Sequence, residues 1–233
     1  MTAGEAWAVV PAAGSGSRMG GASGDPAKQF RLLGGQPVLV HSLDALAAAP
    51  EVSGLVVVVA EEEVEPVRQA LAESPVAEWV RAVVSGGETR QASVTRGVEA
   101  VPESVEIVLV HDAARPFVRP EDVSSVVQAI RRHDAAALAV PVADTLRQSG
   151  GEFFGATVPR DQLWRMQTPQ GAQRGILAGA LARAEREGWA GTDEVGLLTR
   201  AGITVAVLEG DERNLKITRP ADWALAEAIW AAR

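Results

Sequence analysis

The chain has 233 residues, 47% of them apolar, with a formal net charge of −8 and no cysteine. This length suffices for one large domain with a full hydrophobic core. The lack of cysteine excludes disulfides, zinc–thiolate sites and thiol nucleophiles, and the acidic charge argues against a nucleic-acid coat. No apolar run approaches the roughly 20 residues that span a bilayer. The N-terminus carries no basic cluster of the kind that begins a secretory signal. We therefore expect a cytoplasmic protein that binds neither membrane nor nucleic acid.

The first predicted element is a buried strand over Trp7–Val10, followed at once by a loop of small residues, Ala12–Ser17. Such a loop lets backbone N–H groups approach a phosphate, and Arg18 and Lys28 supply positive charge to neutralise it. The glycine spacing fits neither the dinucleotide fingerprint nor the Walker loop, so a plain flexible glycine loop is the alternative. Together with Gly34–Pro37, which lead into an apolar helix, the stretch resembles the nucleotidyltransferase signature of sugar-nucleotide pyrophosphorylases.

Short β-branched runs alternate with longer helical patterns along the rest of the chain. This alternation predicts an α/β fold with a Rossmann-like, mostly parallel sheet and helices on both faces. The predicted later strands cover residues 55–59, 80–84, 107–110, 135–141 and 203–208. The predicted helices cover 38–48, 62–71, 90–100 with Thr89 as N-cap, 120–132, 173–187, a short segment capped by Thr192, and a C-terminal segment capped by Thr218. No linker or repeat interrupts the pattern, so residues 1–233 are expected to form one domain.

Two further motifs follow predicted strands, where the ligands of open α/β sheets gather. Ser85–Ser93 form a glycine turn that leads into a helix, and they also fit an ordinary strand-to-helix turn. His111–Pro116 follow the strand over 107–110. Asp112 in this motif is placed to hold Mg²⁺, which prefers one or two carboxylates plus substrate phosphates, and the alternative is a turn or capping aspartate. His111 is interpreted as a packed residue, because no second histidine or cysteine lies nearby.

The pattern changes over residues 142–160, where Gly150–Gly151 separate two short extended runs and predict a hairpin. Phe153 and Phe154 are adjacent, so a strand would present one on each face. An isolated two-stranded ribbon is barely stable in water. We therefore expect this β-arm to pack on another subunit.

Seven strings of the chain, taken in order, resemble the motifs of the 2-C-methyl-D-erythritol 4-phosphate cytidylyltransferase family: AAGSGSRMG, SGGETRQASV, HDAARPFV, PVADTLR, RDQLWRMQTPQ, TDEVGLL and RNLKITRPAD. The resemblance covers nearly the whole chain, and HDAARP and TPQ are more specific than the glycine loop. It implies a fold of the nucleotide-diphospho-sugar transferase type and transfer of a cytidylyl group from CTP to 2-C-methyl-D-erythritol 4-phosphate, in isoprenoid precursor biosynthesis. It also implies Mg²⁺ as cofactor and a homodimer formed through the arm.

The resemblance implies roles for individual residues. Arg18 and Lys28 would stabilise the charge that develops on the α-phosphate. Arg160 and Lys216 would hold the acceptor phosphate for attack, with Arg160 supplied by its own chain or by the neighbouring subunit. The implied nucleotide-binding residues are Ala12, Ala13, Gly14, Ser15, Gly86, Gly87, Ser93, Asp112 and Ala113, with Asp112 also the metal ligand. The implied acceptor-binding residues are Arg115, Thr145, Arg160, Thr168, Thr192 and Lys216.

The loop after Arg18 departs from the family pattern, which has a shorter loop and a Pro-Lys-Gln run. Here Ala27 separates Pro26 from Lys28, which leaves open whether Lys28 takes the catalytic position of the family's lysine.

Three other functions remain as alternatives. The first is a cytidylyltransferase for another polyol phosphate such as ribitol 5-phosphate, and the second is a sugar-1-phosphate nucleotidyltransferase. The third is a catalytically silent nucleotide-binding subunit. The joint presence of Arg18, Lys28, Asp112 and Lys216 argues against it.

Overall fold

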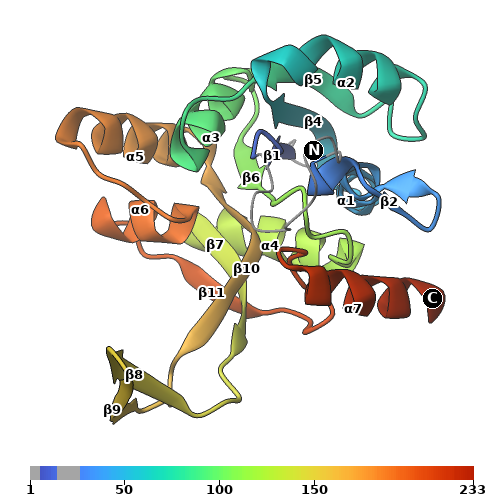
Figure 1. Ribbon diagram of the computed structural model, residues 1–233. Helices are drawn as coiled ribbons and strands as arrows, with labels where there is room; N and C mark the ends of the chain where they lie inside the picture. The colour runs from blue at the N-terminus through green and yellow to red at the C-terminus, as the bar shows by residue number, and fades with distance from the viewer. Residues whose placement is uncertain (1–5, 15–26) are drawn as a thin grey trace.

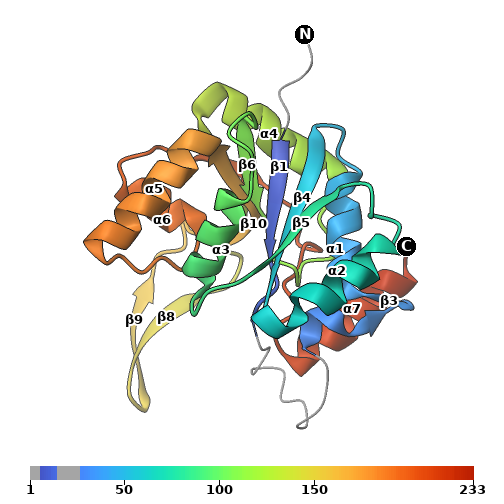
Figure 2. The same cartoon turned by 90° about the horizontal axis from the view of Figure 1, so that it is seen from above.

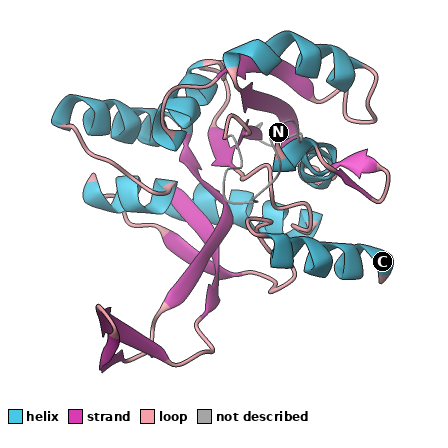
Figure 3. Ribbon diagram, in the orientation of Figure 1, coloured by secondary structure: helices cyan, strands magenta, loops and turns pink. Residues whose placement is uncertain are grey.

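Strands and helices alternate along most of the described chain (Figure 3). The computed structural model describes residues 6–14 and 27–233. The strands are β1 Ala6–Pro11, β2 Leu32–Leu33, β3 Gln36–Pro37, β4 Val52–Val59, β5 Val80–Ser85, β6 Ile107–Val110, β7 Ala135–Pro141, β8 Leu146–Gly150, β9 Phe153–Val158, β10 Trp164–Gln173 and β11 Ala206–Glu209. The helices are α1 Val38–Ala47, α2 Val64–Ala72, α3 Arg90–Glu99, α4 Pro120–His133, α5 Arg174–Glu187, α6 Glu194–Arg200 and α7 Pro220–Ala231, with short 3-10 helices η2 Lys28–Phe30 and η3 Glu61–Glu63.

A seven-stranded sheet with the order β11-β7-β10-β6-β1-β4-β5 forms the centre of the protein (Figure 1). Its neighbouring strands run parallel, except that β10 is antiparallel to both β6 and β7. The predicted mostly parallel α/β fold is therefore confirmed. In the part of the chain that is described, none of the helices has the length and apolar character that a membrane span requires.

Helices cover both faces of the sheet, as predicted (Figure 2). Helices α1, α2 and α4 share one core cluster, and α3, α5 and α6 share the other. The valine-rich strand β4 serves both clusters, because successive side chains of a strand point to opposite faces. Leu55 and Val57 pack on the first cluster, whereas Val56 and Val58 pack on the second. A continuous apolar run is thus the pattern of a strand buried on both sides.

Strand β10 is the strand of the seven-stranded sheet that was not predicted from the sequence. It contains Pro169, and prolines are confined in sheets to edges, strand starts and irregular positions. The β7–β10 register shifts between Met166 and Gln170, so the proline stands where the ladder is interrupted. Gly171 permits close packing here, because a Cβ at this position would stand 2.6 Å from the Val108 carbonyl oxygen. Long-range packing therefore makes a strand where the local pattern does not indicate one.

Two predicted helix caps are wrong by one residue. The N-cap of α6 is Asp193 rather than Thr192, because the Asp193 carboxylate accepts the backbone N–H of Gly196 at 2.9 Å. The N-cap of α7 is Arg219 rather than Thr218, and Asp222 in the first turn accepts both of their backbone N–H groups. The strand predicted over 203–208 is also shifted, and is observed over Ala206–Glu209.

The predicted hairpin is confirmed: β8 and β9 pair antiparallel and project away from the sheet as an arm (Figure 1). In the order of the chain, the arm lies between β7 and β10, which pair with each other in the sheet. Phe153 and Phe154 lie on it with 78% and 84% of their surfaces exposed. Both are residues of strand β9, so the end of the arm exposes one large apolar side chain on each of its faces.

Candidate active site

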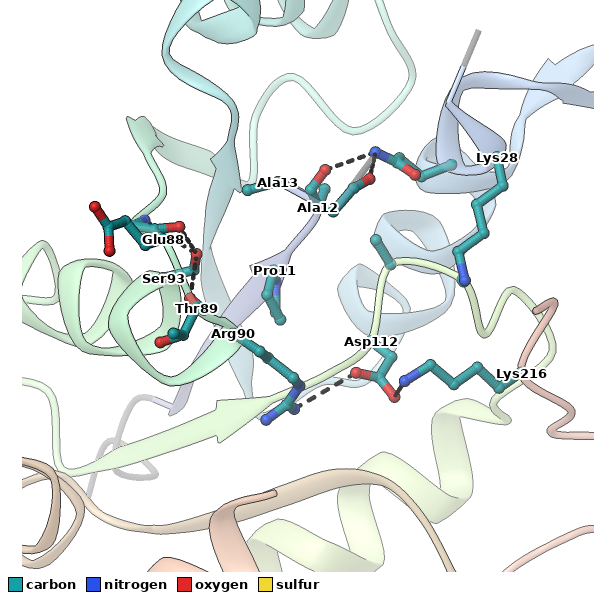
Figure 4. A pocket seen from close by; sticks show the side chains of 15 residues that line it. Pro11, Ala12, Ala13, Lys28, Glu88, Thr89, Arg90, Ser93, Asp112 and Lys216 are labelled. Atoms are coloured by element: carbon teal, nitrogen blue, oxygen red, sulfur yellow. Dashed lines mark hydrogen bonds and ion pairs between the residues drawn. The ribbon is translucent and has the colours of Figure 1, made fainter. Parts of the chain in front are cut away.

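A cavity of about 250 Å³ opens at the carboxyl ends of β1, β5 and β6 (Figure 4). It brings together the first loop, the glycine turn and the motif after β6, as the sequence analysis expected from the placement of ligand sites in open α/β sheets. Its lining residues are Pro11, Ala12, Ala13, Gly14, Lys28, Gln29, Gly87, Glu88, Thr89, Arg90, Ser93, Asp112, Ala113, Ala114 and Lys216. The candidate residues Ser15 and Arg18 lie outside the described residues.

Residues 12–14, the described start of the first loop, are held in place by a backbone hydrogen bond and by a glutamine that was not singled out from the sequence. The Ala12 backbone N–H donates to the Val58 carbonyl at 2.6 Å. The buried Gln29 amide donates to the carbonyls of Ala12 at 2.7 Å and Gly14 at 3.1 Å. Small side chains and a fixed backbone leave this wall of the cavity open to a phosphate-bearing ligand.

The glycine turn lies against the first loop. A Cβ on Gly86 would stand 2.6 Å from the Ala13 Cβ and 2.8 Å from the Ser93 hydroxyl, so only glycine fits. The Ser93 hydroxyl accepts the Gly87 backbone N–H at 3.1 Å and donates to the Thr89 carbonyl at 3.0 Å. The predicted N-cap of α3 is confirmed, because the Thr89 hydroxyl accepts the backbone N–H of residue 92. These bonds fix the turn as one rigid wall.

Asp112 is the centre of the charged groups in the cavity. Its Oδ2 atom lies 2.9 Å from Lys216 Nζ and 3.5 Å from Arg115 Nε, and its Oδ1 atom lies 3.4 Å from Arg90 Nη2. Burial by itself would raise the pKa of Asp112, but Lys216, Arg90 and Arg115 together hold it well below the usual range. The carboxylate is therefore ionised at neutral pH and faces the cavity (Figure 4).

The backbone around Asp112 is fixed by a buried hydrogen-bond chain. The Asp112 backbone N–H donates to the Thr168 hydroxyl at 3.0 Å, and that hydroxyl lies 3.1 Å from His111 Nδ1. His111 Nε2 lies 3.0 Å from the Arg115 carbonyl. Burial lowers the pKa of His111 to about 4, so the imidazole is neutral and donates from Nε2 while Nδ1 accepts from Thr168. His111 is thus a packed residue, as interpreted from the sequence.

Arg90 and Glu194 are charged residues that the sequence analysis missed. Arg90 lines the cavity, and its guanidinium binds Glu194 through both terminal nitrogens at 2.7 Å and 3.0 Å. Glu194 is fully buried, and its backbone N–H donates to the buried Gln170 amide oxygen at 3.0 Å. The sequence held a weak indication of Arg90, because this residue belongs to the glycine turn that was already expected at the ligand-binding end of a strand.

Lys28 reaches the cavity despite the longer loop before it. Its ammonium donates to the Ile217 carbonyl at 2.8 Å, and it lines the cavity together with Lys216 (Figure 4). Three cationic side chains, Lys28, Arg90 and Lys216, therefore line one cavity with the Asp112 carboxylate. Such an arrangement suits the binding of a strongly anionic ligand.

The other candidate acceptor residues do not line the cavity within this chain. Arg115 is buried, and its guanidinium donates to the carbonyls of Asn214 at 2.7 Å and Met166 at 3.2 Å. Thr145, Thr192 and Arg160 lie outside the lining, and Arg160 donates to a carbonyl at the base of the arm. Of the six residues assigned to the acceptor, the structure brings only Lys216 into the cavity.

The fold and the site agree with one protein family. A sequence profile of the 2-C-methyl-D-erythritol 4-phosphate cytidylyltransferase family matches residues 6–232. The chain belongs to this family. It is 49% identical over 222 residues to the 2-C-methyl-D-erythritol 4-phosphate cytidylyltransferase of Salinibacter ruber, covering 95% of this chain and 91% of that one. It is 45% identical over 222 residues to the enzyme of the same name from Deinococcus radiodurans, covering 95% and 88%.

Among solved structures, the 2-C-methyl-D-erythritol 4-phosphate cytidylyltransferase of Thermus thermophilus superposes with a TM-score of 0.81 at 36% identity, covering 97% of this chain and 99% of that one. The resemblance inferred from the seven sequence strings is confirmed, as is the expectation that the chain is a nucleotidyltransferase.

Proposed function

We propose that this cytidylyltransferase-family member transfers a cytidylyl group from CTP to 2-C-methyl-D-erythritol 4-phosphate. The products are 4-diphosphocytidyl-2-C-methyl-D-erythritol and pyrophosphate, in isoprenoid precursor biosynthesis. Family membership supports the identity of the two substrates. The observation that carries the chemistry is the placement of Lys28, Arg90 and Lys216 with the Asp112 carboxylate in one cavity.

The reaction joins two anions, so its main demands are positioning and charge neutralisation rather than a covalent nucleophile. An oxygen of the acceptor phosphate attacks the α-phosphorus of CTP in line. The new phosphorus–oxygen bond forms as the bond to the bridging oxygen of the leaving pyrophosphate breaks. Lys28 neutralises negative charge on the α-phosphate, together with Arg18, which lies outside the described residues. Lys216 holds the acceptor phosphate, because its partly exposed side chain is able to turn from Asp112 toward solvent.

The nucleotide lies between the first loop and the glycine turn. Backbone groups of residues 12–14 face the triphosphate, and those of Gly87 face the cytosine edge, where Ser93 fixes the turn. Gly86, which does not line the cavity, supports this edge from behind. Asp112 and Ala113 contact the ribose or phosphate oxygens. The narrow approach of Gly86 to Ala13 sets the width of this half of the site.

The residues at Asp112 fit a magnesium site of the kind that nucleotides complete. Mg²⁺ takes one or two protein carboxylates and fills its remaining positions with water and substrate phosphates. Asp112 is ionised and faces the cavity, and the described residues contain no group of three or more acidic, histidine or cysteine side chains that would form an all-protein cage. When bound, Mg²⁺ supplies positive charge to the triphosphate. Asp112 then binds and orients the metal–nucleotide complex, while Lys216 turns to the acceptor.

The assembly we propose is a cytoplasmic homodimer formed through the arm, in the compartment where CTP is available. The exposed Phe153 and Phe154 supply an apolar side chain for that contact on each face of the arm. Thr145 and Arg160 stand at the base of the arm, outside the cavity of their own chain. They complete the acceptor site of the partner, and Thr192 borders that site. The buried Thr168 acts on it through its hydrogen bond to the Asp112 backbone.

Substrate identity is tested with a matrix of nucleoside triphosphates and polyol phosphates, followed by pyrophosphate release and the mass of the product. We expect turnover with CTP and 2-C-methyl-D-erythritol 4-phosphate, and little with UTP or purine nucleotides. Preference for ribitol 5-phosphate as acceptor, or for a sugar 1-phosphate with another nucleotide, would reject the proposed function in favour of that reaction. No pyrophosphate release with any pair would indicate a silent nucleotide-binding subunit.

A further inference from the structure

Arg90 stands between two carboxylates, one buried and one facing the cavity. Both terminal nitrogens bind Glu194, Nη1 to Oε1 at 2.7 Å and Nη2 to Oε2 at 3.0 Å. The contact of Nη2 with Asp112 Oδ1 is longer, at 3.4 Å. A planar guanidinium prefers a bidentate pair with one carboxylate, and here that carboxylate is Glu194. Asp112 therefore has only the second, longer hydrogen bond that Nη2 donates.

Glu194 is placed so that it keeps hold of this guanidinium. Its side chain is fully buried, and its backbone N–H donates to Gln170 Oε1 at 3.0 Å. Gln170 is itself buried on the central strand β10, where its amide nitrogen donates to Asp193 and to the Gln167 carbonyl, both at 3.1 Å. Burying an ion pair contributes little net stability compared with apolar side chains of similar size. Because stability does not account for the pair, we consider its effect on Asp112, the other carboxylate that Arg90 contacts.

The three cations around Asp112 differ in how they are held. Lys216 lies 2.9 Å from Oδ2, and 36% of its side chain is exposed, so it is able to turn away. Arg115 is fixed by two backbone carbonyls and lies 3.5 Å away. Arg90 has a guanidinium that could move toward Asp112 and donate to both of its carboxylate oxygens. Its two hydrogen bonds to Glu194 oppose that movement.

We propose that Glu194 is a positioning residue, which keeps Arg90 from closing on Asp112 and thereby leaves that carboxylate available to a divalent metal–nucleotide complex. The proposal rests on the metal role of Asp112 in the proposed function. It assigns the buried acid of α6 to the nucleotide half of the site, although Glu194 lies outside the cavity lining.

The variant Glu194→Gln tests this assignment, because it removes the competing charge and keeps the side-chain size. Arg90 then has Asp112 as the carboxylate within its reach, and the two close into a bidentate pair that excludes the metal. CTP binding is measured by calorimetry, without acceptor, in excess Mg²⁺ and in excess EDTA. We expect Mg²⁺ to increase the affinity of the wild type for CTP, and we expect the variant to lose about tenfold or more of that increase. CTP binding in EDTA should change much less.

A second substitution separates positioning from a general structural role. In Glu194→Gln/Arg90→Gln the guanidinium that would close on Asp112 is absent, so the gain from Mg²⁺ should return. The matched control is Glu187→Gln, which breaks the exposed Arg183–Glu187 pair (2.8 Å) and should leave CTP binding unchanged. Thermal unfolding of each variant reports folding.

The outcomes are distinct. The positioning role is overturned if Mg²⁺ increases the CTP affinity of folded Glu194→Gln as much as that of the wild type. It is also overturned if the double variant does not recover this increase. If Glu194→Gln does not fold, Arg90→Gln alone decides: a retained or enlarged gain supports the proposal, and a lost gain overturns it. Absence of any Mg²⁺ gain in the wild type would instead reject the metal role of Asp112, and this inference with it.

Discussion

Replacement of Lys28 by methionine isolates the contribution of one cation to the reaction. The methionine retains most of the aliphatic stem and removes the ammonium that lines the cavity. Loss of a charge that acts mainly in the transition state typically costs a few kcal/mol, or about a hundredfold in kcat. The same ammonium donates to the Ile217 carbonyl at 2.8 Å, and loss of that half-buried bond should cost about 1 kcal/mol of folding free energy.

These two effects are measured separately. Pyrophosphate release at saturating CTP and 2-C-methyl-D-erythritol 4-phosphate gives kcat, and thermal unfolding gives the stability change. The matched control is Arg31→Met, which removes a cation three residues away that stacks over Trp223 at 4.4 Å and does not line the cavity. We expect the control to keep its kcat. A near-normal kcat for Lys28→Met would show that the longer preceding loop has displaced the lysine from the chemistry, and that another cation acts in its place.

Three further predictions concern the metal, the glycine turn and the arm. Excess chelator should abolish turnover and added Mg²⁺ should restore it, so full activity in EDTA would contradict the metal role of Asp112. Gly86→Ala forces a Cβ to within 2.6 Å of Ala13, and overpacking of about 1–3 kcal/mol should raise the KM for CTP about tenfold or more; an unchanged KM would show that the turn yields freely. Mixing Arg160→Ala with Arg18→Ala, each nearly inactive alone, should restore about a quarter of wild-type activity, because about half the dimers carry one intact site of two. No recovery after verified subunit exchange would mean that Arg160 serves its own chain.

The sheet was largely predictable because its strands are short, valine-rich and separated by clear turns. The bounds predicted for β6 and β7 agree with those observed. Strand β10 was not predictable from local pattern, since its buried residues include Gln167, Thr168 and Gln170, and Pro169 interrupts it. These polar side chains are buried because each finds hydrogen-bond partners on other elements. Such partners are distant in sequence, so no window of neighbouring residues indicates them.

The candidate site was predictable to the extent that motifs follow strands. Asp112 and the two glycine-rich segments were expected at the carboxyl ends of strands, and the structure brings them into one cavity. The pairing of Arg90 with Glu194 joins residues 104 positions apart, and an arginine at a helix start is usually a surface residue. The wrong cap at Thr192 has a simpler origin. Two adjacent residues there are both good caps, and the one that accepts the capping hydrogen bond, from the Gly196 backbone N–H, is Asp193.

The single reversed strand decides where the arm leaves the molecule. Because β7 runs parallel to β6 and β10 runs against both, the chain that connects β7 to β10 has to turn at the edge where β6 ends. Pro141 at the end of β7 pairs with Trp164 at the start of β10, beyond the level at which Val110 pairs with Gln170. An insertion at this turn therefore emerges beside the ligand-binding edge, as Figure 2 shows, and one at the other end of β10 would emerge on the opposite side. Chain topology thus places the arm, and any molecule that binds to it, on the same side of the sheet as the cavity.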